Sequence, residues 1–232
     1  MHANVFLSEL RVERKPSDVC EPVMSGNEGL SAIVDAEKEA AKMLFGLAIA
    51  ISAIPLLLRL PSRPFGIVVD ISEFGFSFLI LVSVWLVYWN IMSVLPMEDR
   101  TIVALNIGLL FLVSIEPYLF YLNITFDLVS HELLLNMASI LYALDMTGLM
   151  VILALFTREL ALEERKLVPK ESLGPYRRFR DVLLISAALF AITVLPPFWT
   201  TKLFDQPIRF IFWFIPLITT SIRSISLHGF QQ

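Results

Sequence analysis

Cysteine and charged residues are scarce in this sequence, and each scarcity excludes a class of site or protein. The single cysteine, Cys20, excludes an intrachain disulfide and a paired-cysteine metal site. Only 17% of the 232 residues are charged and 56% are hydrophobic, whereas about a quarter of the residues in a soluble domain are charged. The net charge of −4 offers no basic surface to nucleic acid, so we expect no nucleic-acid partner. The composition indicates a membrane protein.

Motifs for catalysis or cofactor binding are also missing. His131 and His228 have no partner at the spacing of metal ligands. The sequence has no phosphate-binding loop, no nucleophile elbow and no paired carboxylates on one helix face. We therefore expect no catalytic residue, no metal site, no cofactor and no enzymatic activity. A basic segment followed at once by an apolar stretch is absent too, so we predict no cleavable signal peptide.

Long apolar runs are what the sequence does have, and residues 43–60 (MLFGLAIAISAIPLLLRL) form the first. No charge lies between Met43 and Leu58, which predicts a short membrane-spanning helix. Bulky aliphatic residues recur at helical spacing on one face of this helix: Leu47, Ile51, Ile54 and Leu58. Small residues on the neighbouring face would allow another helix to approach closely: Gly46, Ala50 and Ala53.

The hydropathy pattern predicts an all-α, polytopic membrane protein with six transmembrane helices. The predicted spans are about 43–60, 71–95, 101–122, 132–157, 182–200 and 207–227. We assign residues 1–36 to a flexible cytoplasmic N-terminal segment and residues 37–228 to the six-helix transmembrane domain. Strong helix formers at residues 30–42 are expected to run directly into the first span. The charged segment 158–181 is expected to be a cytoplasmic loop.

The distribution of basic residues predicts the orientation in the membrane. Of the 18 Lys and Arg residues, four fall on the side opposite the N-terminus: Arg59, Arg63, Lys202 and Arg209. Cytoplasmic loops carry the excess of Lys and Arg. We therefore expect a multi-pass protein of the cell membrane with both termini in the cytoplasm, which an even number of spans requires.

Polar residues inside the predicted spans are candidates for an ion path or for ties between helices. Asp145 lies near the middle of the fourth span, where it is either a functional carboxylate or a hydrogen-bonded link between helices. Glu73 and Glu116 lie towards the outer ends of their spans. They either form an acidic vestibule or are solvated or salt-bridged, with Arg209 as a candidate partner for either of them. Asn106 is expected to form a hydrogen bond between helices.

The second and third spans resemble the prokaryotic branch of the transmembrane protein 175 family, relatives of the endosomal and lysosomal potassium channel. The resemblance covers about residues 43–157. It rests on a few residues in matching order: Tyr88 and Trp89, Asp99 in the turn, Asn106, Pro117 and Tyr142. It implies a six-helix subunit of a homotetramer whose first helix lines a cation pore. It also places a hydrophobic constriction on Leu47, Ile51 and Ile54.

The sequence departs from the family at the start of the first helix. The family's Arg-x-x-x-Phe-Ser-Asp signature is absent, and the matching positions hold Ala36, Ala40, Ala41 and Lys42. Met92 replaces a histidine that follows the second-span tryptophan, and Ala50 replaces a threonine near the constriction. The resemblance therefore indicates a divergent member.

Three functions follow as alternatives. The first is a weakly selective channel for potassium or other monovalent cations, formed by a homo-oligomer in the lipid bilayer. The second is a structural or interaction protein of the membrane that keeps the fold but does not conduct. The third is a cation- or proton-coupled transporter that uses Asp145. Bulky aliphatic residues also commonly face lipid, so the constriction and a lipid-facing role stay open for Leu47, Ile51 and Ile54.

Overall fold

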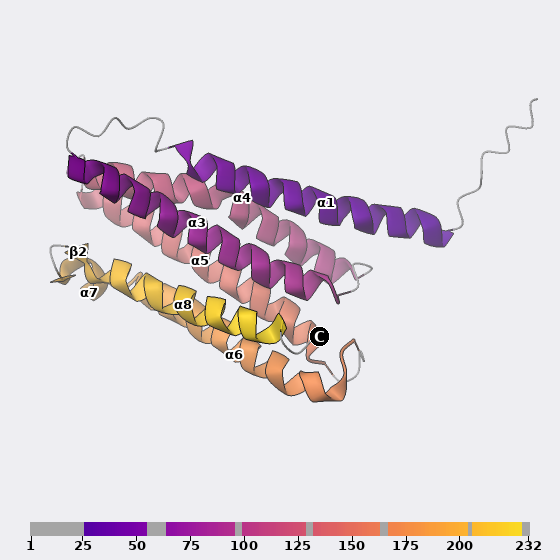
Figure 1. The fold of residues 1–232 in the computed structure, drawn as a ribbon. Helices are drawn as coiled ribbons and strands as arrows, with labels where there is room; N and C mark the ends of the chain where they lie inside the picture. Colours follow the sequence, from indigo (N-terminus) through magenta and orange to yellow (C-terminus); the bar gives the residue numbers. More distant parts are fainter. Residues whose placement is uncertain are drawn as a thin grey trace, which may run out of the picture.

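The structure is a computed structural model, and it describes residues 26–54, 64–95, 99–128, 132–162, 167–203 and 206–228. The helices in these ranges run roughly along one direction (Figure 1). Their bounds are α1 (Gly26–Ser52), α3 (Pro64–Met92), α4 (Arg100–Leu128), α5 (Glu132–Leu160), α6 (Lys170–Ile192), α7 (Pro197–Thr200) and α8 (Ile208–His228). Strands β1 (Lys202–Leu203) and β2 (Gln206–Pro207) form a two-residue antiparallel ladder between α7 and α8. Apart from this ladder the described part is helical, as predicted.

Helices α3, α4 and α5 agree with the predicted second, third and fourth spans. Each has 29 residues, or about 43 Å at 1.5 Å per residue, which exceeds the hydrocarbon core of a bilayer, about 30 Å thick. Three segments in the described residues are long and apolar enough to cross a membrane: Phe74–Met92, Arg100–Asn123 and Leu133–Leu160. The side chain of Asp99 accepts a hydrogen bond from the backbone N–H of Thr101 at 2.9 Å and caps α4. This turn residue of the family resemblance therefore has a structural role.

Helix α1 is one continuous element across the predicted junction of tail and span. It includes residues 26–36, which the sequence assigned to the flexible segment, and it ends at Ser52 rather than near residue 60. Residues 1–25 and 55–63 lie outside the described residues. The helix formers at residues 30–42 do run into the apolar run, as expected.

Helix α6 begins well inside the segment that we expected to be a cytoplasmic loop. Its first turns contain the charged residues 170–181, and its buried side chains recur at helical spacing through that region: Leu173, Tyr176, Phe179 and Leu183. Because this apolar stripe is narrow and flanked by arginines, mean hydropathy did not reveal it. The helix ends at Ile192, before Pro196 and Pro197, which have no N–H to continue it.

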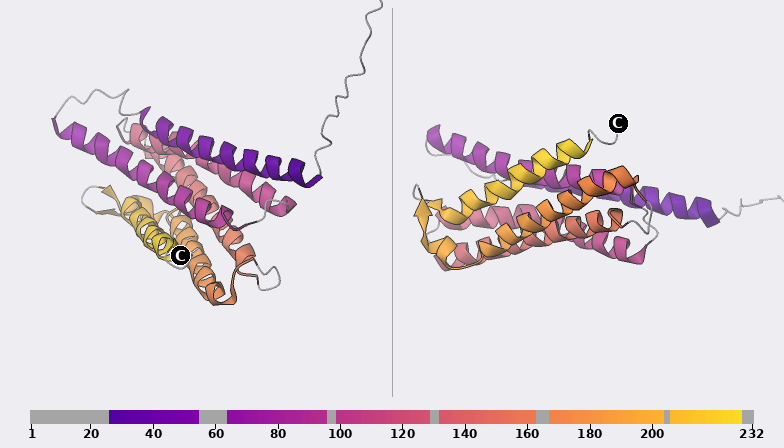
Figure 2. Two further views of the ribbon diagram at one scale, coloured as in Figure 1. Left: turned by 45° about the vertical axis from the view of Figure 1, so that its right-hand side comes forward. Right: turned by 90° about the horizontal axis from the view of Figure 1, so that it is seen from below.

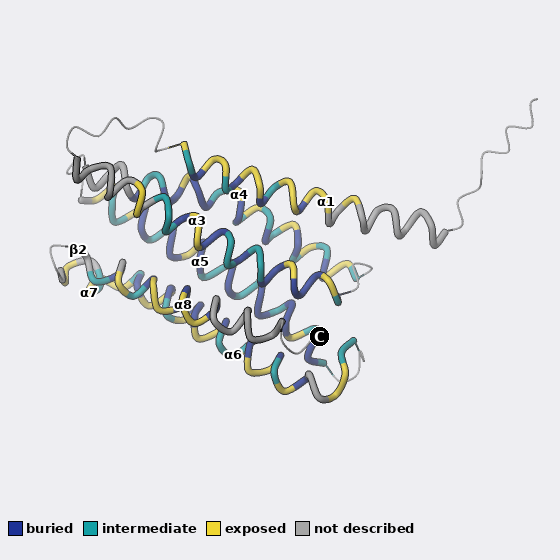
Figure 3. Tube along the Cα trace, viewed as in Figure 1, coloured by how far each residue is buried: buried dark blue, intermediate teal, exposed yellow. Residues whose placement is uncertain are grey.

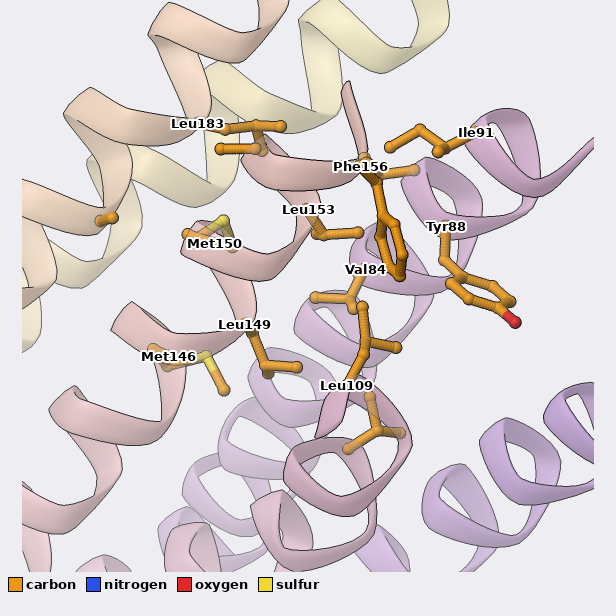
Figure 4. Packing of buried hydrophobic residues seen from close by; sticks show 14 of the residues in the cluster. Val84, Tyr88, Ile91, Leu109, Met146, Leu149, Met150, Leu153, Phe156 and Leu183 are labelled. Atoms are coloured by element: carbon orange, nitrogen blue, oxygen red, sulfur yellow. The ribbon is translucent and has the colours of Figure 1, made fainter. Parts of the chain in front are cut away.

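The core of the bundle is centred on α5. This helix packs against α4 on one side and α6 on the other, while α3 contacts α4, α5 and α8. Figure 4 shows Val84 and Tyr88 of α3, Leu153 and Phe156 of α5 and Leu183 of α6 within this core. Helix α1 lies at the edge, where it packs against α4 and α3, and α6 and α8 lie on the far side of the bundle (Figure 2). Among the described helices, α1 thus has neighbours on one side, α3 and α4.

Polar ties hold the second half of the bundle together. The indole N–H of Trp213 on α8 donates to the hydroxyl oxygen of Thr193 at the end of α6, at 3.0 Å. The hydroxyl of Ser139 on α5 donates to the side-chain oxygen of Asn123 on α4. Such bonds satisfy polar groups where water is absent.

The start of α1 and the end of α8 lie at the same end of the bundle (Figure 1).

The close approach of α4 and α5 generates a first prediction. A Cβ atom added at Gly148 would lie 2.9 Å from Leu112 Cδ1, whereas one added at Gly174 on α6 meets no atom within 4 Å. We expect Gly148→Leu to lower the free energy of unfolding by about 1–3 kcal/mol through overpacking. The matched Gly174→Leu should leave it unchanged or raise it slightly, since leucine favours helix. Thermal unfolding in detergent measures both, and equal midpoints would contradict the packing.

Candidate pore helix and buried carboxyl groups

Helix α1 divides into a covered and an uncovered face. The covered face consists of residues at helical spacing that α3 and α4 bury: Ala41, Phe45, Ala48 and Ser52. The ring of Phe45 lies 5.5 Å from that of Tyr88 on α3, centroid to centroid. This contact sets the rotation of α1 about its own axis.

Leu47 and Ile51 lie on the uncovered side of α1, and Ile54 is exposed two residues beyond the end of that helix at Ser52. Leu47 is 56% exposed, Ile51 37% and Ile54 42%, and Met43 one turn earlier is also exposed. Exposed stretches recur from turn to turn along the outer side of the helix (Figure 3). Leu47, Ile51 and Ile54 are thus all exposed among the described residues of the chain.

The small residues of α1 do not pack against another described helix of the same chain. Gly46 and Ala50 are exposed, and a Cβ atom added at Gly46 would meet no atom within 4 Å. Ala53, just beyond the end of α1, is half-buried. The constriction and the lipid-facing role of the aliphatic strip both stay predictions. Both strips lie side by side on the uncovered surface.

A cation and aromatic rings replace the polar signature that the family resemblance led us to look for. Lys42 Nζ lies 5.0 Å from the ring centroid of Trp89 and 3.0 Å from a carboxylate oxygen of Glu39. Exposed contacts of these kinds each contribute about 1 kcal/mol or less. Residues at the end of α3 line a small cavity of about 110 Å³ beside this contact: Tyr88, Trp89, Met92 and Ser93. The junction of α1 and α3 is mainly apolar and aromatic.

Glu116 differs from both expectations for it, because in the described part of the chain it is neither solvated nor paired with Arg209. Its side chain is 0% exposed, and its carboxylate oxygens accept from the hydroxyl of Ser77 on α3 at 3.4 and 3.5 Å. Arg209, itself buried, instead donates to the side-chain oxygen of Asn136 at 3.3 Å. The side chain of Glu73, the other predicted vestibule residue, lies outside the described residues.

Asp145 lies inside the bundle, as expected for an acid in the middle of a span. It is 5% exposed, and among the described residues neither of its carboxylate oxygens has a hydrogen-bond partner. The hydroxyl of Tyr142, one turn away on α5, is buried and likewise has no partner in the described part of the chain. Asn106 is buried on α4, away from the uncovered face of α1.

Sequence reasoning missed the buried roles of Arg209, Ser77 and Tyr142. Arg209 was counted among the basic residues at the outer end of the sixth predicted span, and the signal that it is buried, a lone arginine directly before six apolar residues, is weak. Ser77 is an ordinary serine in an apolar helix until Glu116 is known to face it. Only the tertiary structure shows that Ser77 contacts Glu116 and that Arg209 contacts Asn136.

The chain matches a known protein in its fold, whereas the comparisons by sequence found no match. No protein-family model and no curated protein matches the sequence. Among solved structures, the subunit matches the crystal structure of a lysosomal potassium-selective channel TMEM175 homologue from Chamaesiphon minutus, with a TM-score of 0.58 and 18% sequence identity. The match covers 83% of this chain and 98% of that chain. The chain therefore has the fold of that TMEM175 homologue, which supports the relationship to the transmembrane protein 175 family that the sequence resembles.

Proposed function

We propose that the chain is a subunit of a potassium-permeable, weakly selective cation channel of the cell membrane. In this proposal several copies, four by the family resemblance, surround a pore with their α1 helices. Leu47, Ile51 and Ile54 then form a hydrophobic constriction that gates by excluding water. The main observation in support is that Leu47, Ile51 and Ile54 are exposed at the edge of the helical bundle. The stretch between residues 43 and 54 also contains no charged side chain.

The two strips on the uncovered face suit two different contacts in such an assembly. Small residues allow helix backbones to approach closely, so Gly46 and Ala50 suit the contact with α1 of a neighbouring subunit. Packing through that strip would turn the adjacent Leu47 and Ile51 towards a common axis. The fold similarity adds weight, because the matched protein is named as a potassium-selective channel and not as an enzyme.

The same proposal includes six spans with both termini in the cytoplasm. Three helical segments in the described ranges are long and apolar enough to cross a membrane. Six spans require that α1, α6 and α8 cross the bilayer as well. Two observations support this: the chain starts and ends its helices at one end of the bundle, and the basic residues gather at that end. Arg209, counted on the opposite side, is buried in contact with Asn136 and so leaves the bias intact.

Polar substitution in the constriction should raise conduction. Asparagine at position 51 would let water wet the narrow ring, so Ile51→Asn should increase potassium flux into reconstituted liposomes several-fold over the wild-type protein. Ile185→Asn is the matched control, because Ile185 is an exposed isoleucine on α6, far from α1. Equal flux in the two variants would refute a pore at α1. No flux in any of the three proteins would favour the non-conducting alternative.

Cysteine substitution can distinguish a pore-facing from a lipid-facing α1. In a Cys20→Ser background, which has no other cysteine, Leu47→Cys should react with charged, water-soluble thiol reagents and lose most of its flux. Oxidation should also cross-link α1 helices of neighbouring subunits. Ile185→Cys should do neither, since we expect it to face lipid. If the thiol introduced at position 47 is protected from the reagents and forms no cross-link, this face of α1 lies against acyl chains.

A further inference from the structure

Two acidic side chains lie inside the subunit and have no role in the proposed pore. Glu116 on α4 and Asp145 on α5 are both at least nine-tenths buried, and neither belongs to the uncovered face of α1. An ionised carboxylate without compensation is costly inside a membrane-embedded bundle. Such a pair is neutralised either by protons or by a bound cation.

The two carboxyl groups lie at the same level of the bundle. The rings of Phe120 on α4 and Tyr142 on α5 are in contact, with centroids 5.9 Å apart. Glu116 precedes Phe120 by one turn and Asp145 follows Tyr142 by one turn. Because α4 and α5 run in opposite directions (Figure 1), both steps lead the same way along the bundle. If both carboxyl groups were ionised, their like charges would repel one another.

Hydroxyl groups from two helices complete the surroundings. Ser77 on α3 donates to Glu116. The buried hydroxyl of Tyr142 and both carboxylate oxygens of Asp145 have no hydrogen-bond partner among the described residues.

No basic side chain supplies the missing compensation in the described ranges. The ion pairs found there, Lys42 with Glu39 and Arg180 with Asp181, lie at exposed positions. The buried guanidinium of Arg209 is held at Asn136, about 14 Å along α5 from Asp145 at 1.5 Å per residue. A bound cation would fill this role.

We propose that Glu116, Asp145, Ser77 and Tyr142 bind one alkali-metal cation within each subunit, between α3, α4 and α5. The donor set consists entirely of oxygen, which suits hard cations. No group of three or more His, Cys, Asp or Glu side chains in the described residues is placed to hold a metal ion, so the site lacks the larger acidic set of a divalent-ion site. The site is separate from the pore and does not depend on the channel proposal.

Thermal unfolding of the full chain in detergent tests the site. At constant ionic strength and pH, replacing N-methylglucamine chloride with sodium or potassium chloride should raise the midpoint saturably, by roughly 2–4 °C, since the ion binds the folded state. Asp145→Asn and Glu116→Gln should abolish this dependence. Both variants should also be at least as stable as the wild type in N-methylglucamine, because they remove buried charge. Asp181→Asn, at an exposed position, is the control and should keep the full alkali-ion effect.

Other results would overturn the site. Stabilisation by lower pH without any alkali-ion effect would show that a proton compensates the pair, and stabilisation by magnesium or calcium alone would show a divalent site. A wild-type midpoint insensitive to all ions would show that no cation binds. Ile51→Asn should retain the alkali-ion effect whether or not it conducts, which separates failure of this site from failure of the pore.

Discussion

The packing of Phe45 and Ala48 against α3 and α4 is the contact on which the functional interpretation depends. Between residues 43 and 52, helix α1 has bulky or small apolar residues on all sides, with Ser52 as its single polar side chain, so hydropathy alone does not select a buried face. The contact of Phe45 with Tyr88 selects it, because two large rings occupy the space between α1 and α3. Everything on the opposite side of the helix, including Leu47 and Ile51, is left for lipid or for another subunit.

The interior treats polar groups in two different ways. Most buried hydroxyl groups, such as those of Thr157 and Thr220, donate to a backbone carbonyl one turn earlier in their own helix. Trp213 and Thr193 satisfy one another across α6 and α8. Asp145 has no such arrangement in the described part of the chain. An acid of this kind is expensive to keep in an apolar bundle, which is why it is the basis of a functional inference and the threonines are not.

The shared fold tolerates a different chemistry at the junction of α1 and α3. The subunit retains the architecture of a channel homologue at 18% identity, although Lys42 and Met92 stand where the family resemblance predicts an acid and a histidine. The cation–aromatic contact of Lys42 with Trp89 and the buried thioether of Met92 provide apolar and cation–π packing at this junction. Helix packing depends on volume and shape, so the arrangement of helices can persist while the polar contacts change.

The sequence by itself determined the membrane class, the helical fold and the approximate positions of α3, α4 and α5, because long uncharged apolar runs have few other stable structures in a bilayer. It also grouped Leu47, Ile51 and Ile54 on one face, since helical periodicity fixes that grouping. The sequence analysis missed the first turns of α6, because their apolar stripe lies between arginines and mean hydropathy does not reveal it. Only the tertiary structure decided that the face with Leu47 is uncovered, that Glu116 is buried against Ser77 and that Arg209 contacts Asn136. The rotation of each helix and the pairing of distant polar groups depend on how side chains from several helices fill one another's gaps, and no single helix carries that information.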